Sequence, residues 1–262
     1  MSKFKKIYSL TTQFFYYLLS HVLCIQNTFY GGHMVKRFLD LTRFEFYLWI
    51  TSVVVVCLSF VLPEEKDYLT LIASLIGVTA LIYVAKGYVI GQVLSVVFAV
   101  FYGIISFYFR YYGEVITYLC MTAPIAIMAV ISWAKHPYQD TKEVVVNKMT
   151  KGQCVLMWGL ALIVTIAFYF ILKYFNTTNL IFSTISVTTS FLASYMTFMR
   201  SPYYGIGYAA NDVVLIILWI LASVINPSYI PMILCFVMFL INDLYGFYNW
   251  RRIENKQKKD LA

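Results

Sequence analysis

The chain has 262 residues, of which 61% are apolar, 19% aromatic and only 12% charged, and its formal net charge is +8. Soluble domains carry about a quarter charged residues, and a soluble domain of this length could not cover its surface with so few. The composition excludes secreted disulfide scaffolds, nucleic-acid binders and cytosolic enzymes, and it indicates a polytopic α-helical membrane protein.

The first 43 residues fit a membrane span poorly. Lysines followed by an aromatic run imitate a signal peptide, but polar residues interrupt the run and no small-residue cleavage site follows. We therefore expect residues 1–43 to form a cytoplasmic or interfacial segment. A second interpretation places the translation start at Met34, because the Gly31-Gly32 pair before it is what a purine-rich ribosome-binding site would encode if it were translated.

Long charge-free runs occupy most of the remaining chain. Five of them, at 68–85, 87–109, 115–134, 152–172 and 174–199, hold 18, 23, 20, 21 and 26 residues. A helix that crosses a bilayer needs about 20 apolar residues. Together with turn-forming residues at the breaks, the pattern predicts an all-α protein with eight transmembrane helices. Their expected ranges are 44–62, 68–86, 88–109, 114–134, 153–173, 178–199, 203–225 and 228–250.

The distribution of lysine and arginine predicts the orientation. With the N-terminus in the cytoplasm, 17 of the 20 basic residues fall on the inner side and only three on the outer side. Such an excess on one side is the positive-inside signal. We expect a multi-pass protein of the plasma (inner) membrane with both termini cytoplasmic and a basic cytoplasmic tail at 251–262. The bilayer is therefore one expected partner, and nucleic acid is not.

Two segments of the chain resemble each other and predict an internal repeat. The sequence SLIGVT at 74–79 is matched by STISVT at 183–188, and Trp133 and Trp250 each close a three-helix unit before a basic segment. One linking helix between the units gives both the same orientation, so the repeats are expected to be parallel. The expected domains are an additional transmembrane helix at 44–62, repeat 1 at 68–134, a linker helix at 153–173 and repeat 2 at 178–250.

Three helices, a linker and three more helices resemble the PnuC family of vitamin and nucleoside-precursor transporters, which are relatives of the SWEET facilitators. The sequences that carry the resemblance are RYYGE at 110–114, YAAND at 208–212 and NDLYGFYNW at 242–250. The chain departs from the family at 126–133, which lacks an expected asparagine, glycine and second tryptophan, and at 203–207, where tryptophans are common. The resemblance implies a transporter for nicotinamide riboside or a related water-soluble vitamin precursor.

The principal candidate for a binding site lies in span seven. A carboxylate near the bilayer centre costs about 2.5–3.5 kcal/mol on insertion scales and is a functional candidate by default, and Asp212 lies ten residues into the span. Asn211 points about 100° away around the helix, while Tyr208 and Trp219 share the face of Asp212. The competing interpretation is an interhelical hydrogen bond, worth about 0.6 kcal/mol on average.

The nicotinamide riboside that the resemblance implies would need aromatic or carboxylate groups for its cationic ring and side-chain amides for its carboxamide. Further candidate substrate-binding residues are Gln92 in span three, Asn242 and Tyr245 in span eight, and the rings of Tyr204 and Trp133. Asp243 lies nearer the cytoplasmic end of span eight, where it is expected to reach water. Arg110 and Glu114 flank the outer turn between spans three and four, where a surface ion pair is the favoured interpretation.

Several chemistries have no sequence support. The chain contains no phosphate-binding loop of an ATPase, no metalloprotease or serine-hydrolase motif, and no cluster of metal ligands. No cofactor or metal is therefore expected. The leading hypothesis is a facilitative uniporter for a small-molecule substrate. Metabolic trapping inside the cell would maintain the concentration gradient that drives uptake. The alternatives are an intramembrane enzyme acting on a lipid-soluble substrate and a non-transporting membrane subunit, and homo-oligomer formation stays open.

Overall fold

The computed structural model describes residues 40–61, 68–108 and 112–260. The N-terminal segment expected before residue 40 and the alternative start at Met34 lie outside these residues. The chain divides into two compact units, residues 1–46 and 47–262. In the first unit, Thr42 and Glu45 exchange the reciprocal hydrogen bonds of a capping box, which begins helix α2 (Arg43–Ser59).

Helices make up nearly all of the second unit. After α2 the elements are α3 (Tyr68–Ala85), α4 (Val89–Tyr108), α5 (Tyr112–Ile116), η2 (Thr117–Thr122), α6 (Ala123–Ala134), α7 (Lys151–Tyr174), α8 (Leu180–Phe198), α9 (Tyr204–Ile225), η3 (Pro227–Tyr229) and α10 (Ile230–Lys259). Within the described residues, seven helical stretches are long and apolar enough to cross a membrane, and α2 is slightly shorter, at 17 residues. The predicted all-helical membrane class is confirmed.

The fourth predicted span is a single irregular helix made of α5, η2 and α6. Its middle segment, Thr117–Thr122, has π-helical hydrogen bonding, and the Ala123 amide donates to the carbonyl of Tyr118. Pro124 follows directly, and proline has no amide hydrogen with which to make the α-helical bond to the Cys120 carbonyl. The wider π turn absorbs this missing bond, and such turns often occur at functional sites.

Six helices form a closed ring. α3, α4, α6, α8, α9 and α10 each pack against the next, and α10 packs back against α3. The order of neighbours repeats after three helices, so that α3, α4 and α6 take the places that α8, α9 and α10 take on the other side. This is the arrangement that two parallel three-helix repeats would produce. The repeat itself stays a prediction.

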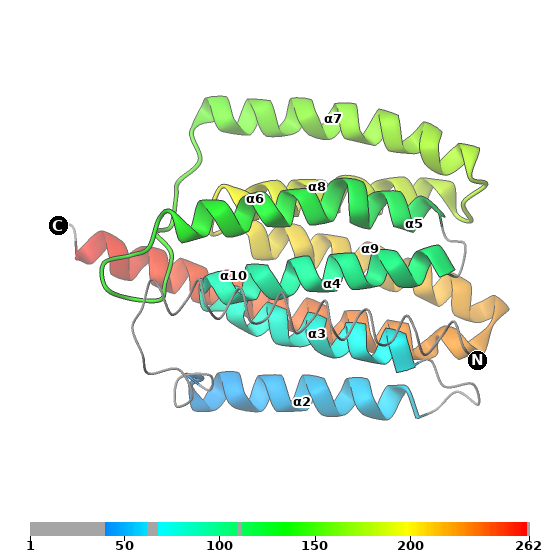
Figure 1. The fold of residues 1–262 in the computed structure, drawn as a ribbon, viewed down its shortest axis with the longest axis horizontal. Helices are drawn as coiled ribbons and strands as arrows, with labels where there is room; N and C mark the ends of the chain where they lie inside the picture. The colour runs from blue at the N-terminus through cyan, green and yellow to red at the C-terminus, as the bar shows by residue number, and fades with distance from the viewer. Residues whose placement is uncertain (1–39, 62–67, 109–111, 261–262) are drawn as a thin grey trace. The chain divides into compact units, whose positions relative to one another are not determined.

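The linker helix α7 packs against α8 on the outside of the ring (Figure 1). Thr150 and Gln153 form a capping box that begins it. One face is buried through Met157, Ala161, Phe168 and Leu172. The opposite face exposes large apolar side chains such as Trp158, of which 61% is exposed. In a membrane protein such a face is in contact with lipid, which accounts for an amount of exposed apolar surface that a soluble protein would not tolerate.

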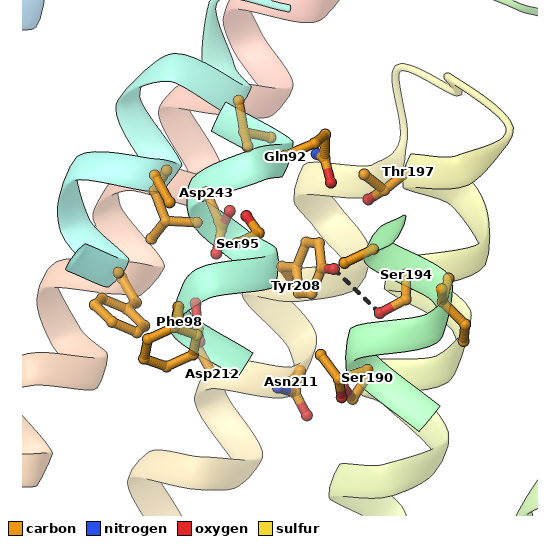
Figure 2. Close-up of a pocket in the computed structure, with 18 of the residues that line it drawn as sticks. Gln92, Ser95, Phe98, Ser190, Ser194, Thr197, Tyr208, Asn211, Asp212 and Asp243 are labelled. Carbon is orange, nitrogen blue, oxygen red and sulfur yellow. Dashed lines mark hydrogen bonds between the residues drawn. The ribbon is translucent and has the colours of Figure 1, made fainter. Parts of the chain in front are cut away.

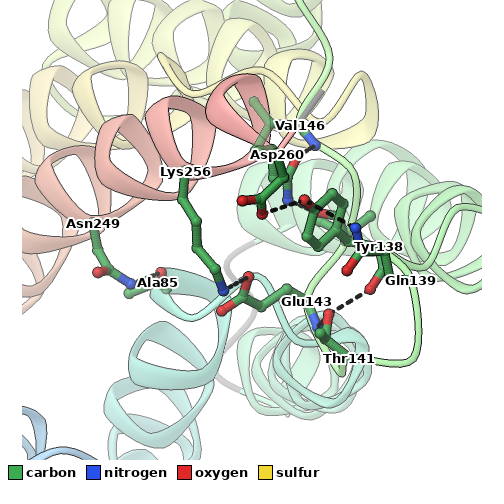
Figure 3. Close-up of polar contacts among 11 residues, drawn as sticks. Ala85, Tyr138, Gln139, Thr141, Glu143, Val146, Asn249, Lys256 and Asp260 are labelled. Carbon is green, nitrogen blue, oxygen red and sulfur yellow. Dashed lines mark hydrogen bonds and ion pairs between the residues drawn. The ribbon is translucent and has the colours of Figure 1, made fainter. Parts of the chain in front are cut away.

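The end of the bundle where α3, α6 and α8 terminate is called the basic end here, because the predicted inner loops lie there. The loop at 135–150 is bound at this end to the last turns of α10 (Figure 3). Gln257 donates from its side-chain amide to the Val144 carbonyl over 3.0 Å, and Lys256 lies 3.5 Å from the Glu143 carboxylate. α10 ends at Lys259, beyond the end predicted at 250, because these contacts continue the helix past the apolar segment.

Candidate functional site

A cavity of about 110 Å³ lies inside the ring, and all three helices of each predicted repeat contribute to its wall. Its polar lining comes mainly from α4, α8, α9 and α10: Gln92, Ser95, Ser190, Ser194, Thr197, Tyr208, Asn211, Asp212 and Asp243 (Figure 2). Small apolar residues of α3 and α6 and the rings of Phe98, Phe236 and Phe239 complete it. Among the lining residues, two are acidic and none is Lys, Arg or His.

Asp212 of α9 and Asp243 of α10 form a carboxyl pair within this cavity. Each is only 3% exposed, and their carboxyl groups lie within hydrogen-bonding range of each other. Two carboxyl groups can hydrogen-bond to each other only when one of them carries a proton. Asp212 Oδ2 is fully buried and accepts no hydrogen bond from the described residues. The pair therefore presents a buried acidic oxygen to whatever occupies the cavity.

Gly205 allows the two carboxyl groups to approach each other. A Cβ atom at this position would lie 2.5 Å from the backbone oxygen of Asp243 and 2.7 Å from the Phe247 amide nitrogen. Only a glycine lets the α9 backbone come so close to α10. Because Asp212 is two turns further along α9, the close approach at Gly205 fixes the distance between the helices that carry the pair.

Two side-chain amides face the same cavity. Asn211 accepts hydrogen bonds at its amide oxygen from Ser186, over 3.2 Å, and from Thr189, over 2.9 Å, both on α8. These bonds orient the group and leave its amide nitrogen, which has no hydrogen-bond partner among the described residues, available to a ligand. Gln92 is 3% exposed and its amide likewise has no partner in the described part of the chain, so both its donor and its acceptor are available.

Hydroxyl groups supply the remaining polar surface. The hydroxyls of Ser194 and Tyr208 lie 3.1 Å apart across the interface between α8 and α9 (Figure 2). Each hydroxyl can donate and accept a hydrogen bond, so this pair can either donate to a solute or accept from it. At the basic end, the rings of Tyr204 and Trp250 pack at 5.0 Å and belong to a buried cluster with Val84 of the cavity wall and Val144 of the 135–150 loop.

The structure brings together four of the nine residues that the sequence predicted for the site. Gln92, Tyr208, Asn211 and Asp212 line the cavity. The other five do not line it: Trp133, Tyr204, Trp219, Asn242 and Tyr245. All nine substrate-binding assignments stay predictions.

Neighbouring side chains explain why three of those five lie elsewhere. Trp133 is completely buried and donates its indole hydrogen to the Thr197 carbonyl. Asn242 faces α2, where its amide nitrogen donates to Ser52 over 2.9 Å. Trp219 lies towards the opposite end of α9, with its ring 5.5 Å from that of Tyr229. Helical spacing alone placed Trp219 on the face of Asp212, but it lies two turns away along the helix axis.

Two acidic residues have surroundings that the sequence did not predict. Asp243 was expected to reach water, yet it is buried beside Asp212 because α9 covers it. Glu114 was expected in a surface ion pair with Arg110, which lies outside the described residues. Glu114 is half-buried and lies within hydrogen-bonding range of the Tyr102 hydroxyl of α4. The sequence did carry one signal for the carboxyl pair, because an Asn-Asp doublet occurs in both span seven and span eight.

The described residues contain no group of His, Cys, Asp or Glu side chains that could hold a metal ion. The ligand groups that they do offer are a carboxyl pair, two amides and several hydroxyls. This donor set suits an organic solute that carries a positive charge, hydrogen-bonding groups and a flat ring.

Comparison with known proteins agrees with this chemistry. The sequence profile of the family described as nicotinamide mononucleotide transporter matches residues 67–252. A curated protein from Neisseria mucosa, named nicotinamide riboside transporter PnuC, is 23% identical over 195 residues, which cover 72% of this chain and 74% of that protein. The crystal structure of the vitamin B3 transporter PnuC matches with a TM-score of 0.73 at 22% identity, over 86% of this chain and 100% of the other. The predicted resemblance to PnuC transporters is confirmed.

Proposed function

The chain belongs to the family of nicotinamide mononucleotide transporters, and from this premise we propose that it carries nicotinamide riboside, or a closely related cationic nucleoside, across the inner membrane by facilitated diffusion. Membership of a transporter family confirms the prediction of a multi-pass membrane transporter rather than an enzyme. The solute, the membrane and the direction are what we propose.

The observation that carries the proposal is the carboxyl pair of Asp212 and Asp243 in a cavity whose lining contains no basic residue. A buried negative charge without a partner is costly, and a cationic ligand would compensate it. Nicotinamide riboside carries one positive charge on its pyridinium ring. The mononucleotide adds a phosphate with about −1.5 to −2 charge at neutral pH, which the carboxyl pair would repel. The charge of the cavity therefore favours the riboside.

The other cavity groups match the remaining parts of this solute. A carboxamide both donates and accepts hydrogen bonds. The amide nitrogen of Asn211 can donate to its oxygen, and the amide of Gln92 can both donate and accept. The ribose hydroxyls find hydroxyl partners on α8 and α9, at Ser194 and Tyr208. The cavity lies where the two halves of the ring meet, which is where transporters built from repeats bind their substrates. Relative movement of the halves would open it to either side.

The electrochemical gradient of the solute would supply the energy for net uptake, because the sequence has no ATP-binding loop. Conversion of the solute inside the cell to a form that the cavity rejects would maintain that gradient. Phosphorylation to the mononucleotide would serve, since it replaces a cation by a species that carries a phosphate.

Calorimetric titration of the purified protein tests this proposal. Nicotinamide riboside should bind, and the mononucleotide should bind at least about tenfold more weakly. Asp212→Asn and Asp243→Asn should each weaken binding of the riboside by about 1.5–3 kcal/mol, the range for hydrogen bonds to charged groups. Asp140→Asn, which makes the same chemical change on the exposed 135–150 loop, should bind as the wild type does. Tighter binding of the mononucleotide than of the riboside would overturn the choice of solute.

The proposed orientation has its own test. In a background without native cysteines, Thr177→Cys between α7 and α8 should react with a membrane-impermeant maleimide in intact cells. Asp140→Cys should react only after the cells are permeabilised. The reverse pattern would place the basic end outside and contradict the distribution of basic residues.

A further inference from the structure

Three aromatic rings form a continuous cluster beyond the cavity, towards the end of the bundle opposite the basic end. Phe98 and Tyr118 belong to the cavity wall, and Tyr102 extends the cluster away from it. The ring centroids of Tyr102 and Tyr118 lie 4.6 Å apart, and Phe98 lies 5.8 Å from Tyr102 and 6.1 Å from Tyr118. All three rings are half-buried rather than enclosed.

A carboxylate lies at the far side of these rings. Glu114 is in the first turn of α5 and lies within hydrogen-bonding range of the Tyr102 hydroxyl. A tyrosine hydroxyl donates one hydrogen bond, whereas a carboxylate can accept about four, so Tyr102 leaves most of the acceptor capacity of Glu114 unused. Tyr118 lies within electrostatic range of both Glu114 and Asp212. The rings therefore connect one carboxylate to the other.

The π-helical segment Thr117–Thr122 contributes Tyr118 to both places. It follows α5 directly, so the local geometry that sets the position of Tyr118 also sets its distance from Glu114. The lining of the cavity and the carboxylate beyond it are thus parts of one irregular helix. Aromatic faces combined with a carboxylate are the groups by which proteins recognise organic cations.

We propose that Glu114, together with Phe98, Tyr102 and Tyr118, forms a second binding station for an organic cation, next to the central cavity and on the outer side of it. The inference rests on the proposed function, from which it takes the positive charge of the solute. A cation arriving from outside occupies this station first and then passes along the rings to the carboxyl pair. The station raises the rate of capture of a cation and does nothing for a neutral molecule of the same shape.

Uptake into proteoliposomes of two matched solutes provides the test. The first is nicotinamide riboside, and the second is its 1,4-dihydro form, which keeps the ribose and the carboxamide but has no positive charge. Glu114→Gln removes the charge and keeps an oxygen that can accept a hydrogen bond from Tyr102. This variant should raise KM for the riboside by about threefold to tenfold, the range expected from one cation–π or ionic contact, and leave KM for the dihydro form within about twofold.

Glu143→Gln is the matched control, because it makes the same chemical change in the 135–150 loop, outside the station and the cavity. It should leave KM for both solutes within about twofold of the wild type. Equal effects of Glu114→Gln on the two solutes, or no effect on the riboside, would overturn the station and leave the central site untouched.

Absence of uptake of both solutes by the wild type would instead defeat the proposed function. The station is then tested with 1-methylpyridinium and protein in detergent that carries Asp212→Asn and Asp243→Asn. Loss of the remaining binding on addition of Glu114→Gln supports the station, and unchanged binding overturns it.

Discussion

Trp133 and Trp250 pack against each other at the basic end, with ring centroids 5.2 Å apart, and both are completely buried. Trp133 ends the third helix of one predicted repeat and donates its indole hydrogen to the Thr197 carbonyl over 2.9 Å. Trp250 lies in the third helix of the other and donates to the Val84 carbonyl over 2.8 Å. Each indole therefore bonds to the last turn of the first helix in the opposite repeat, as two-fold symmetry requires.

This reciprocal bonding predicts that the two tryptophans contribute equally to the stability of the protein. Trp133→Phe and Trp250→Phe each leave a buried carbonyl without its donor, which costs about 1–3 kcal/mol. Thermal unfolding in detergent should show similar decreases in Tm for the two variants. Trp158→Phe on the exposed face of α7 should unfold as the wild type does. A large decrease for only one of the pair would contradict the symmetry.

The two asparagines that the sequence treated alike should behave differently. Asn211→Ala removes an amide from the cavity and should weaken binding of the riboside by about 1–3 kcal/mol. Asn242→Ala removes the bond to Ser52 between α10 and α2, so it should lower Tm and leave the affinity nearly unchanged. Calorimetric titration and thermal unfolding of both variants separate the two roles. Normal binding by Asn211→Ala would remove this residue from the site.

Gly205 should be needed for both the fold and the site. In Gly205→Ala the new methyl group meets backbone atoms of α10, which cannot yield as a flexible side chain could. The helices must move apart, so we expect a lower Tm and weaker binding of the riboside. Gly159→Ala is the matched control, because a Cβ there meets nothing within 4 Å. Alanine should stabilise that position in α7 by about 0.5–1 kcal/mol.

The sequence predicted the helices well because lipid imposes one requirement on every span. About 20 apolar residues are needed whatever the neighbours are, and charged breaks such as Lys86-Gly87 interrupt the pattern cleanly. The end of α10 was missed because its last turns are held by contacts with the 135–150 loop. Those contacts depend on tertiary structure, and no periodicity in the sequence reveals them.

The site was predicted only in part because helical spacing gives the direction of a side chain and says little about its depth. Asp212 and Tyr208 share a face and lie at the level of the cavity, whereas Trp219 shares the face and lies beyond it. Asn242 and Asn211 are each followed by an aspartate in the sequence, but α2 covers the side of α10 to which Asn242 points. Which neighbour faces a given polar residue follows from the order of helices around the ring, and that order is not readable from a single span.

A pH effect is expected at the basic end, outside the membrane spans. The hydroxyl of Tyr138 donates to the Asp260 carboxylate over 2.7 Å (Figure 3), and this bond raises the pKa of Tyr138 from 10.0 to about 12. Because the folded pKa is higher than the unfolded one, the contribution to stability is complete below about pH 10 and is lost as the pH rises towards 12. The difference in Tm between the wild type and Tyr138→Phe should therefore shrink between pH 10 and pH 12.

The control for that measurement is Tyr174→Phe, since Tyr174 is 80% exposed at the other end of the bundle. Its difference from the wild type should stay near zero over the same pH range. A constant difference for Tyr138→Phe would show that the ring packs in the loop without any energetic role for its hydroxyl.

Facilitated diffusion of a cation makes a quantitative prediction for uptake. In liposomes clamped at zero membrane potential, the internal concentration of riboside should rise to the external one and stop, and imposed sodium or proton gradients should not change that level. With an inside-negative potential, the single charge should give about tenfold accumulation for each 59 mV, by the same arithmetic that converts potentials into equilibrium constants. Accumulation at zero potential that follows a proton gradient would contradict this. It would show that the proton shared by Asp212 and Asp243 moves with the solute, and Asp243→Asn should then abolish the coupling.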